Sequence, residues 1–284
     1  MIWVGLTGWG DHIDLYEGIL SASKEKLKTY AGHFPIVEVD TSFYAIQSER
    51  NMTKWVNDTP ESFRFIVKAY QGITGHQRGD IPFQSKKEMF EAFKLSLKPI
   101  IEGNKLAAIL CQFPPWFDCR REHVDYLRYC REAFADLDVA LEFRHQSWFL
   151  EDYRHQTLEY MKKDKWIHSI CDEPQAGKRS IPFVPTITTV NKSLFRFHGR
   201  NVHGWTKPVK GQDWRDVRYL YDYNDKELKE LASTIRTLSK ETKQCYVLFN
   251  NNSGGHAAKN AKDFIKILGL TYTDLAPRQL GLFD

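Results

Sequence analysis

The sequence contains few cysteines, and their spacing fits neither disulfide nor zinc motifs. The five lie at Cys111, Cys119, Cys130, Cys171 and Cys245, an odd number without a CxxC spacing. This argues against a disulfide framework and against a zinc knuckle. Cys111, Cys171 and Cys245 lie within apolar runs, so we expect them to be reduced thiols of the core.

Long apolar runs are also missing. No stretch approaches the roughly 20 residues of a membrane-spanning helix, and the start of the chain lacks the basic and apolar segments of a secretory leader. We therefore expect a cytoplasmic protein without a membrane partner. The net charge of +4 is small, so it permits a polyanionic partner without requiring one.

The chain does contain a regular alternation of two kinds of segment. Short β-rich apolar runs lie near 2–7, 35–40, 63–68, 105–112, 138–144, 166–172, 193–198 and 244–250. Helical periodicity occupies 23–32, 48–57, 84–102, 121–135, 151–164, 225–241 and 256–268. Eight buried strands alternating with helices, without a GxGxxG turn, predict a single (β/α)8 TIM-type barrel. We expect it to span 1–272, followed by a flexible tail at 273–284.

The alternation is imperfect at the sixth and seventh crossovers. Residues 173–192 contain three prolines and no helical stripe, and residues 199–224 are polar, basic and aromatic. Long loops in a compact domain are more often functional than idle. The alternative is that each loop is only a solvated excursion.

Polar or charged residues end all eight predicted strands. Because side chains alternate along a strand, Glu142 and Arg144 should face the barrel axis while Leu141 and Phe143 face the helices. The predicted mouth gathers four carboxylates and five basic groups: Glu38, Asp40, Glu142 and Asp172, and Arg64, Lys68, Arg144, Arg196 and His198. Active sites of this fold lie at these strand ends. A structural ion-pair network is the alternative reading.

Such a mixture perturbs pKa values, as acid–base chemistry requires. The catalytic candidates are Glu38, Asp40, Lys68, Glu142, His145, Asp172 and His198. Glu142 and Asp172 would act in acid–base chemistry or as metal ligands, and His198 as a general acid. Glu38, Glu142, Asp172 and His198 are suitable ligand types for a divalent metal, but no HExxH or close histidine pair requires one.

The eighth predicted strand ends in an anion-binding pattern. Asn250 and Asn251 precede Gly254 and Gly255 at the start of a helix, where backbone N–H groups favour phosphate. A simple capped turn is the alternative. Arg196 and Arg200 would add charge, Gly199 would allow close approach, and Tyr44, Trp148 and Trp205 could stack on a base or sugar. The predicted binding set is Trp9, Tyr44, Arg64, Gln112, Arg144, Trp148, Arg196, Gly199, Arg200, Trp205, Asn250, Asn251, Gly254 and Gly255.

Seven motifs lie in order along nearly the whole chain. They are Gly5-Leu6-Thr7-Gly8-Trp9, Val37-Glu38-Val39-Asp40-Thr41-Ser42-Phe43-Tyr44, Phe63-Arg64-Phe65-Ile66-Val67-Lys68-Ala69, Gln112-Phe113-Pro114-Pro115, Leu141-Glu142-Phe143-Arg144-His145, Arg196-Phe197-His198-Gly199 and Phe249-Asn250-Asn251. Together these motifs resemble the DUF72 (YecE-like, UPF0759) family. The resemblance implies a TIM-type barrel and supplies no reaction.

The end of the chain resembles the QLxLF peptide that binds the bacterial DNA sliding clamp. Gln279 could make polar contacts, while Leu280, Leu282 and Phe283 supply apolar groups for a groove. The alternative is that this tail packs on its own barrel. The motif implies the clamp as a partner.

Three functions fit these features. The first is an enzyme acting on a phosphate-bearing substrate, with DNA as a candidate, through phosphodiester or sugar-phosphate chemistry and recruitment by the clamp. The second is a phosphorylated-sugar enzyme unrelated to DNA. The third is a non-catalytic adaptor that binds nucleic acid.

Overall fold

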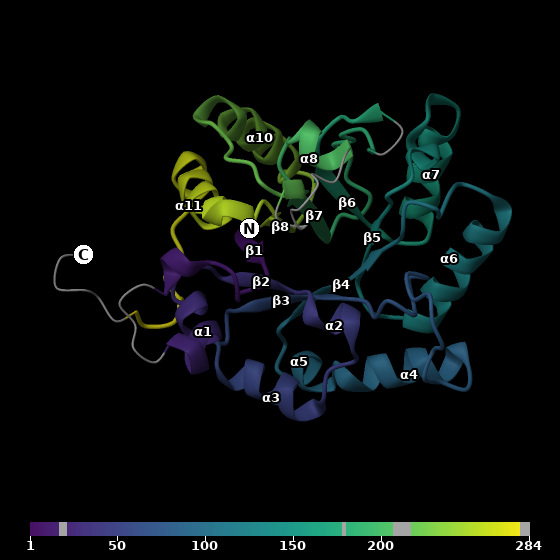
Figure 1. Ribbon diagram of the computed structural model, residues 1–284, viewed down its shortest axis with the longest axis horizontal. Coiled ribbons are helices and arrows are strands. Elements are labelled where there is room, and N and C mark those ends of the chain that lie inside the picture. The colour runs from purple at the N-terminus through teal and green to yellow at the C-terminus, as the bar shows by residue number, and fades with distance from the viewer. Residues whose placement is uncertain (17–21, 178–179, 207–216, 279–284) are drawn as a thin grey trace.

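A closed barrel of eight parallel strands forms the centre of the molecule (Figure 1). The structure, a computed structural model, describes residues 1–16, 22–177, 180–206 and 217–278. The strands are β1 (Ile2–Thr7), β2 (Ile36–Val39), β3 (Arg64–Lys68), β4 (Leu106–Gln112), β5 (Val139–Glu142), β6 (Ile167–Asp172), β7 (Lys192–Phe197) and β8 (Gln244–Phe249). All eight predicted strands are present in order, so the predicted (β/α)8 fold is confirmed.

Helices surround the barrel. They are α1 (Ala22–Ala31), α2 (Thr41–Tyr44), α3 (Glu49–Asn57), α4 (Lys86–Ser96), α5 (Lys98–Glu102), α6 (Arg121–Phe134), α7 (Glu151–Lys163), α8 (Val202–Thr206), α10 (Asp225–Leu238) and α11 (His256–Leu268), with short 3-10 turns η1 (Ile13–Leu15), η2 (Gln146–Phe149) and η4 (Ser253–Gly255). The helix predicted over 84–102 is two helices. Pro99 lies at the start of α5, where its missing N–H is tolerated, and this explains the break.

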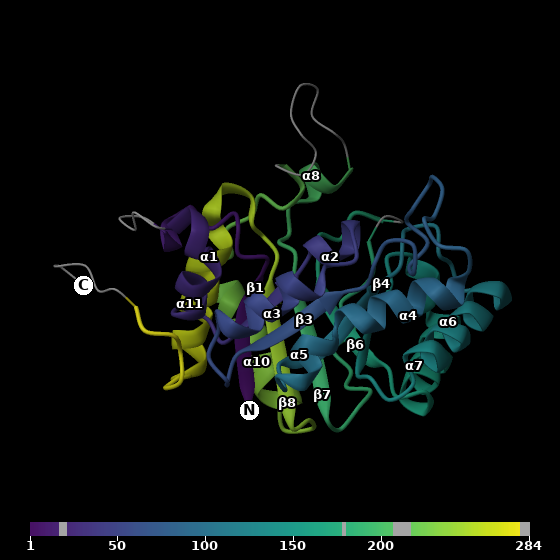
Figure 2. The ribbon, with the colours of Figure 1, turned by 90° about the horizontal axis from the view of Figure 1, so that it is seen from below.

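The barrel interior changes character along its axis. An apolar inner cluster fills the amino-terminal part, with Ile36, Ile66, Ala140 and Leu194 among its members. Farther along the same strands, Glu38, Glu142 and Arg196 are also buried. Because the apolar inner cluster fills the amino-terminal part, the buried charged side chains lie at the carboxyl-terminal end of the barrel. In Figure 2 this end lies towards α2 and α8, opposite the N-terminus.

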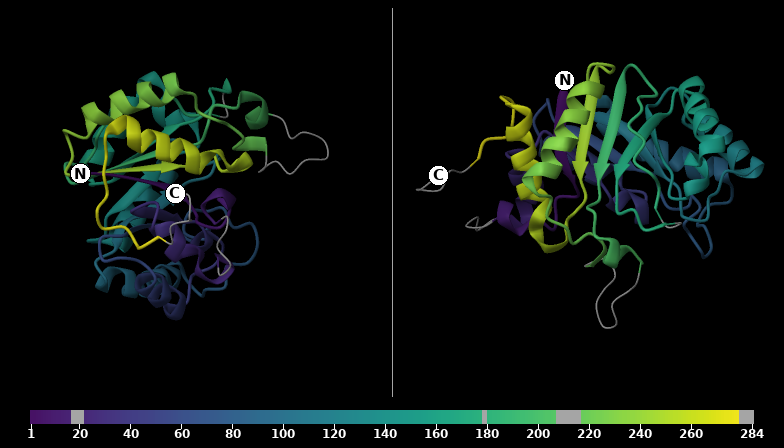
Figure 3. Two further views of the ribbon diagram at one scale, coloured as in Figure 1. Left: turned by 90° about the vertical axis from the view of Figure 1, so that its left-hand side faces the viewer. Right: turned by 90° about the horizontal axis from the view of Figure 1, so that it is seen from above.

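The sixth crossover replaces a helix with extended chain. Between β6 and β7, the described residues form no α-helix, as predicted from the prolines. The segment packs back along β6 instead, because Thr188 Oγ1 accepts a hydrogen bond from the His168 N–H at 2.9 Å and donates to Trp166 O at 2.7 Å. The seventh crossover carries α8 beyond the carboxyl ends of β7 and β8 (Figure 3).

Two of the eight strand pairings are short. Strands β1 and β2 are matched at Leu6↔Val37 and Thr7↔Glu38, and β5 and β6 at two positions, whereas β7 and β8 are matched at six. Near the first short pairing the backbones approach closely. A Cβ atom at Gly5 would lie 2.1 Å from Ile36 O, so only glycine fits there.

The segment after α11 contacts the barrel. Ala276 N donates to Ala31 O at 3.0 Å, and Ser62 Oγ donates to Asp274 O at 2.8 Å. The sequence predicted a flexible tail from residue 273 onward. In the structure, Asp274 and Ala276 at the start of this segment have hydrogen-bond partners on the barrel domain. Gln279, Leu280, Leu282 and Phe283 lie outside the described residues. Among the helices that the structure describes, none has the length and apolar character needed to cross a membrane.

Candidate active site

A chain of alternating acids and arginines crosses the carboxyl-terminal end of the barrel. Arg196, on β7, donates to both oxygens of Glu38 at 2.7 and 2.9 Å and to Glu142 Oε2 at 2.6 Å. Arg144 follows β5; its Nη2 forms an ion pair with Glu142 Oε1 at 2.8 Å, and its Nη1 donates to Glu173 Oε2 at 2.7 Å. We call Glu38, Arg196, Glu142, Arg144 and Glu173 the ion chain. Its members are at most 8% exposed, so each charge depends on its neighbours.

The ion chain holds three carboxyl groups but two guanidinium groups. Burial raises the pKa of Glu38 and of Glu173 to about 7, although arginines act in the opposite direction. Glu142 is also buried, but the charges of Arg144 and Arg196 and the hydrogen bond from Gln112 hold its pKa well below the usual range. The central carboxylate is therefore ionised at neutral pH, and the two outer carboxyl groups take up protons near pH 7.

Neighbouring strands fix the central carboxylate. Gln112, whose partner across β4 and β5 is Glu142, donates to its Oε1 at 2.5 Å. Ser169, on β6, donates to Oε2 at 3.0 Å. Together with the hydrogen bond from Arg196 to Oε2 and the ion pair between Arg144 and Oε1, these bonds hold the carboxylate in one orientation.

His198 is enclosed beside the ion chain. Its Nε2 lies 3.1 Å from Arg144 Nη2, and its Nδ1 lies 2.7 Å from the Asn250 side-chain amide. Burial and the charges of Arg144 and Arg196 hold the pKa of His198 well below its usual value. A guanidinium can only donate, so Nε2 accepts and the imidazole is neutral. This disfavours the predicted role of His198 as a general acid.

Lys68 brings a cation to the outer edge of this site. Its Nζ lies 3.3 Å from Asp40 Oδ1 and 4.9 Å from the centre of the Phe43 ring, and its side chain is 14% exposed. The backbone of Lys68 is tied to α2 by Ser42, in the single turn of that helix, whose Oγ lies within hydrogen-bond distance of Val39 O and Lys68 O, at 2.7 and 2.6 Å. Lys68 thus remains accessible while the ion chain behind it is buried.

The seventh crossover covers Arg144 with aromatic side chains. Trp205, on α8, lies with its ring centre 5.8 Å from Arg144 Cζ and 3.9 Å from Arg218 Cζ. Tyr219 lies 6.1 Å from His198, measured between ring centres. Trp205 is 2% exposed, so in this structure it packs over the site instead of presenting a free face for stacking.

Several residues predicted for the mouth lie elsewhere. Arg64 begins β3 at the opposite end of the barrel, where it donates to Glu61 O and Phe63 O, so its predicted place at the mouth is wrong. Asp172 faces away from the axis, because alternation along β6 places Cys171 inside. It pairs with Arg200 at 2.8 Å.

Other predicted residues support the rim. Trp148 is 1% exposed and donates to Phe117 O, so it cannot stack on a ligand. His145 caps η2 and contacts Ser147 at 2.7 Å. Asn251 is buried and donates to Tyr221 O and Asn260 Oδ1. Among the other residues predicted to bind a ligand, Trp9 packs edge-on against Trp55, and the Gly199 N–H donates to the Tyr223 hydroxyl. Gly254 and Gly255 have left-handed backbone conformations directly before α11.

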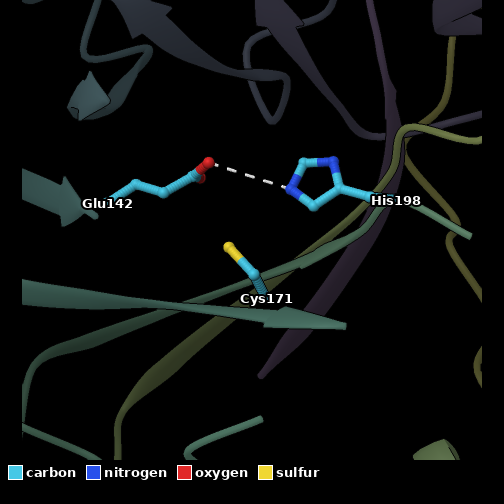
Figure 4. A group of neighbouring side chains, drawn as sticks. All are labelled: Glu142, Cys171 and His198. Atoms are coloured by element: carbon cyan, nitrogen blue, oxygen red, sulfur yellow. Dashed lines mark ion pairs between the residues drawn. The ribbon is translucent and has the colours of Figure 1, made fainter. Parts of the chain in front are cut away.

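Three side chains in the described part of the chain could together offer ligands to a metal. Glu142, Cys171 and His198 place one oxygen, one sulfur and one nitrogen within 4.8 Å of one another (Figure 4). Of the four ligands predicted from the sequence, only Glu142 and His198 belong to this group. Both already contact Arg144, and a cation would have to displace that guanidinium and Arg196. The donor set therefore does not fit a resident metal.

Sequence reasoning missed three axial residues, two in β6 and one directly after it. Ser169, Cys171 and Glu173 follow Ile167 at alternate positions, and all face the site. The signal was present, because Ile167 begins the same inward alternation. The alternation was missed because Cys171 was interpreted as a reduced core thiol and because the predicted strand, 166–172, ends at the polar Asp172.

The fold and the site define a single-barrel (β/α)8 protein with a buried ion chain at its carboxyl-terminal mouth. Residues 3–280 match the family described as "Protein of unknown function DUF72". The chain therefore belongs to the DUF72 family, as its motifs predicted.

Relatives and solved structures agree with this membership. The chain is 58% identical over 283 residues to the UPF0759 protein YunF of Bacillus subtilis, with 100% of both proteins covered. A DUF72 family protein of Enterococcus faecalis V583 has a TM-score of 0.91 and 42% identity, covering 99% of this chain and 100% of that one. One from Thermotoga maritima MSB8 has a TM-score of 0.77 and 32% identity, covering 95% and 100%.

Proposed function

We propose that the carboxyl-terminal mouth is the active site of an enzyme acting on a phosphate-bearing substrate. The observation that carries this proposal is the placement of Lys68 beside the buried ion chain. Burying five charged groups for stability alone is costly, since well-packed apolar residues often serve as well. A partly exposed cation in front of such a chain is suited to an anionic group that arrives from solvent.

The groups around Lys68 suit proton transfer. Glu38 has a pKa of about 7, so it can gain or lose a proton at neutral pH. Arg196 joins Glu38 to Glu142, so a change in the charge of one carboxyl group is felt by the other. Phosphodiester and sugar-phosphate chemistry both use such a combination of fixed cations and a titrating acid.

Replacing Lys68 with methionine should weaken binding of phosphate compounds by about 10- to 100-fold, because one charge-assisted contact is lost. The fold should persist, since Lys68 is partly exposed and pairs with one acid. Binding of pyrophosphate and of glucose 6-phosphate can be measured by calorimetry. Lys68 is a better target than Glu142, whose removal would leave Arg144 and Arg196 buried without their shared partner.

Lys192 provides a matched control. It begins β7, at the far end of the barrel, where its Nζ lies 2.7 Å from Asp138 and its side chain is 16% exposed. Methionine at Lys192 should leave phosphate binding unchanged. Equal affinities for the Lys68→Met and Lys192→Met variants, or no phosphate binding by the unaltered protein, would contradict the proposal.

DNA is the substrate that the C-terminal motif favours, and the sliding clamp is the partner. The support is the Gln279-Leu280-Gly281-Leu282-Phe283 sequence, with two adjacent apolar anchors. We expect a peptide of residues 275–284 to bind a bacterial sliding clamp in a fluorescence anisotropy titration. The double substitution Leu282→Ala/Phe283→Ala should abolish this binding, and undiminished binding would refute the clamp proposal without affecting the active site.

A further inference from the structure

Four aromatic side chains gather outside the ion chain, on the loops that follow three neighbouring strands. Phe43 and Tyr44 belong to α2 after β2, His76 follows β3, and Trp116 follows β4. Ring centres are 5.2 Å apart for Phe43 and Tyr44, 5.0 Å for Phe43 and His76, and 5.9 Å for His76 and Trp116. We call these four residues the aromatic platform. Its two ends, Tyr44 and Trp116, are 53% and 50% exposed.

Backbone hydrogen bonds fix the platform to the barrel. Gln71 N donates to Phe43 O at 2.8 Å, which ties the loop after β3 to α2. His76 N donates to Gln71 O at 3.0 Å, and Phe117 N donates to Pro114 O at 2.9 Å in the turn that carries Trp116. The backbone segments that carry the rings are therefore fixed before any ligand arrives, which lowers the entropic cost of binding.

Cations lie along the platform. Lys68 Nζ lies over the Phe43 ring, 4.9 Å from its centre, and Arg78 Cζ lies over the Trp116 ring, 5.5 Å from its centre, so each cation covers one face of its ring. Partial burial and the nearby charges of Lys68 and Arg144 lower the pKa of His76 to about 4. His76 is thus a neutral aromatic ring at physiological pH.

We propose that the aromatic platform is a binding subsite for the planar base of a nucleoside phosphate whose phosphate groups lie at Lys68. This rests on the proposed function, because Lys68 supplies the phosphate contact. Exposed aromatic faces stack with any base, and flanking cations favour a ligand that carries negative charge. A sugar phosphate offers the same charge but no aromatic ring, so stacking distinguishes the two ligand classes.

The test compares three probes that share phosphate but differ in the attached group. Calorimetry with pyrophosphate, glucose 6-phosphate and ADP should show that ADP binds most tightly. Replacing Trp116 with alanine should weaken ADP binding about tenfold or more and leave pyrophosphate binding unchanged, because one stacking contact is lost. Trp116→Phe should restore most of the affinity. Trp116 is half exposed, so the variants should fold, which a urea titration checks.

Tyr153 is the matched control, since it is an exposed aromatic residue on α7, 49% accessible. Tyr153→Ala should leave all three affinities unchanged. Equal wild-type affinities for ADP and pyrophosphate, or an equal loss for glucose 6-phosphate and ADP in Trp116→Ala, would refute the platform alone. Failure of every probe to bind the unaltered protein would refute the proposed function as well.

Discussion

Replacing Arg196 with methionine should lower the free energy of unfolding by about 3–5 kcal/mol. Arg196 is 1% exposed and is the hydrogen-bonded partner of both Glu38 and Glu142, each 0% exposed. Without the guanidinium, two carboxyl groups remain buried near each other, and methionine cannot donate a hydrogen bond to either. Urea denaturation at pH 7 measures the change.

Arg121 provides the control for this substitution. It lies on α6 with a side chain that is 96% exposed, so Arg121→Met should leave the unfolding midpoint nearly unchanged. The loss caused by Arg196→Met should shrink as the pH falls through about 7, where Glu38 gains a proton and one of the two buried negative charges is removed. A loss below about 1 kcal/mol at pH 7 would show that water replaces the guanidinium, and that the ion chain is not a dry network.

The second large effect concerns the pH dependence of stability. Burial raises the pKa of Glu173 from 4.5 to about 7. Between these values the folded protein keeps a proton that the unfolded chain releases, so this group lowers the free energy of unfolding as the pH rises from about 4.5 to 7. The full shift corresponds to at most about 3 kcal/mol. Glu173→Gln cannot ionise and removes this contribution.

The stability of the Glu173→Gln variant relative to the unaltered protein should therefore increase between pH 4.5 and 7.5. Comparing the two proteins at each pH cancels the opposite contributions of His76 and His168, whose pKa values are lowered to about 4. Urea titrations at half-unit steps measure the difference, with Glu159→Gln on the exposed face of α7 as the control. A difference that stays constant or decreases would contradict the raised pKa.

The fold was predictable because its signals are local. Alternation of buried strands and amphipathic helices gave all eight strands in order, and prolines correctly predicted the missing helix before β7. The break before α5 was missed, because Pro99 is compatible with either a helix start or a continued periodic pattern. Helix α2 is a single turn, too short to produce any periodicity.

The site residues were predicted correctly where the alternation of side chains along a strand was used to place them. They were misplaced where a residue was chosen only because it is polar or charged. Glu38, Glu142 and Arg196 were placed on the axis by alternation, and the structure brings them together. Asp172 was assigned to the mouth as a polar strand end, although alternation from Ile167 turns it away from the axis. Alternation does place Arg64 on the face of Lys68, but Arg64 begins its strand and so lies at the other end of the barrel. Trp116 and His76 lie in loops, which have neither the helical nor the strand periodicity. Only tertiary structure could therefore place His76 against Phe43 and Trp116 against His76.

The two short strand pairings lie at opposite sides of the barrel. One separates β1 from β2 and the other separates β5 from β6, so the ladder divides the cylinder into two half-barrels of four strands each. Glu38 and Glu142 belong to one half, and Arg196 belongs to the other. Arg144 and Glu173 span the second seam in the same way. The ion pairs of the mouth therefore also connect the two half-barrels. A ligand or proton that alters these ion pairs changes the contacts between the halves.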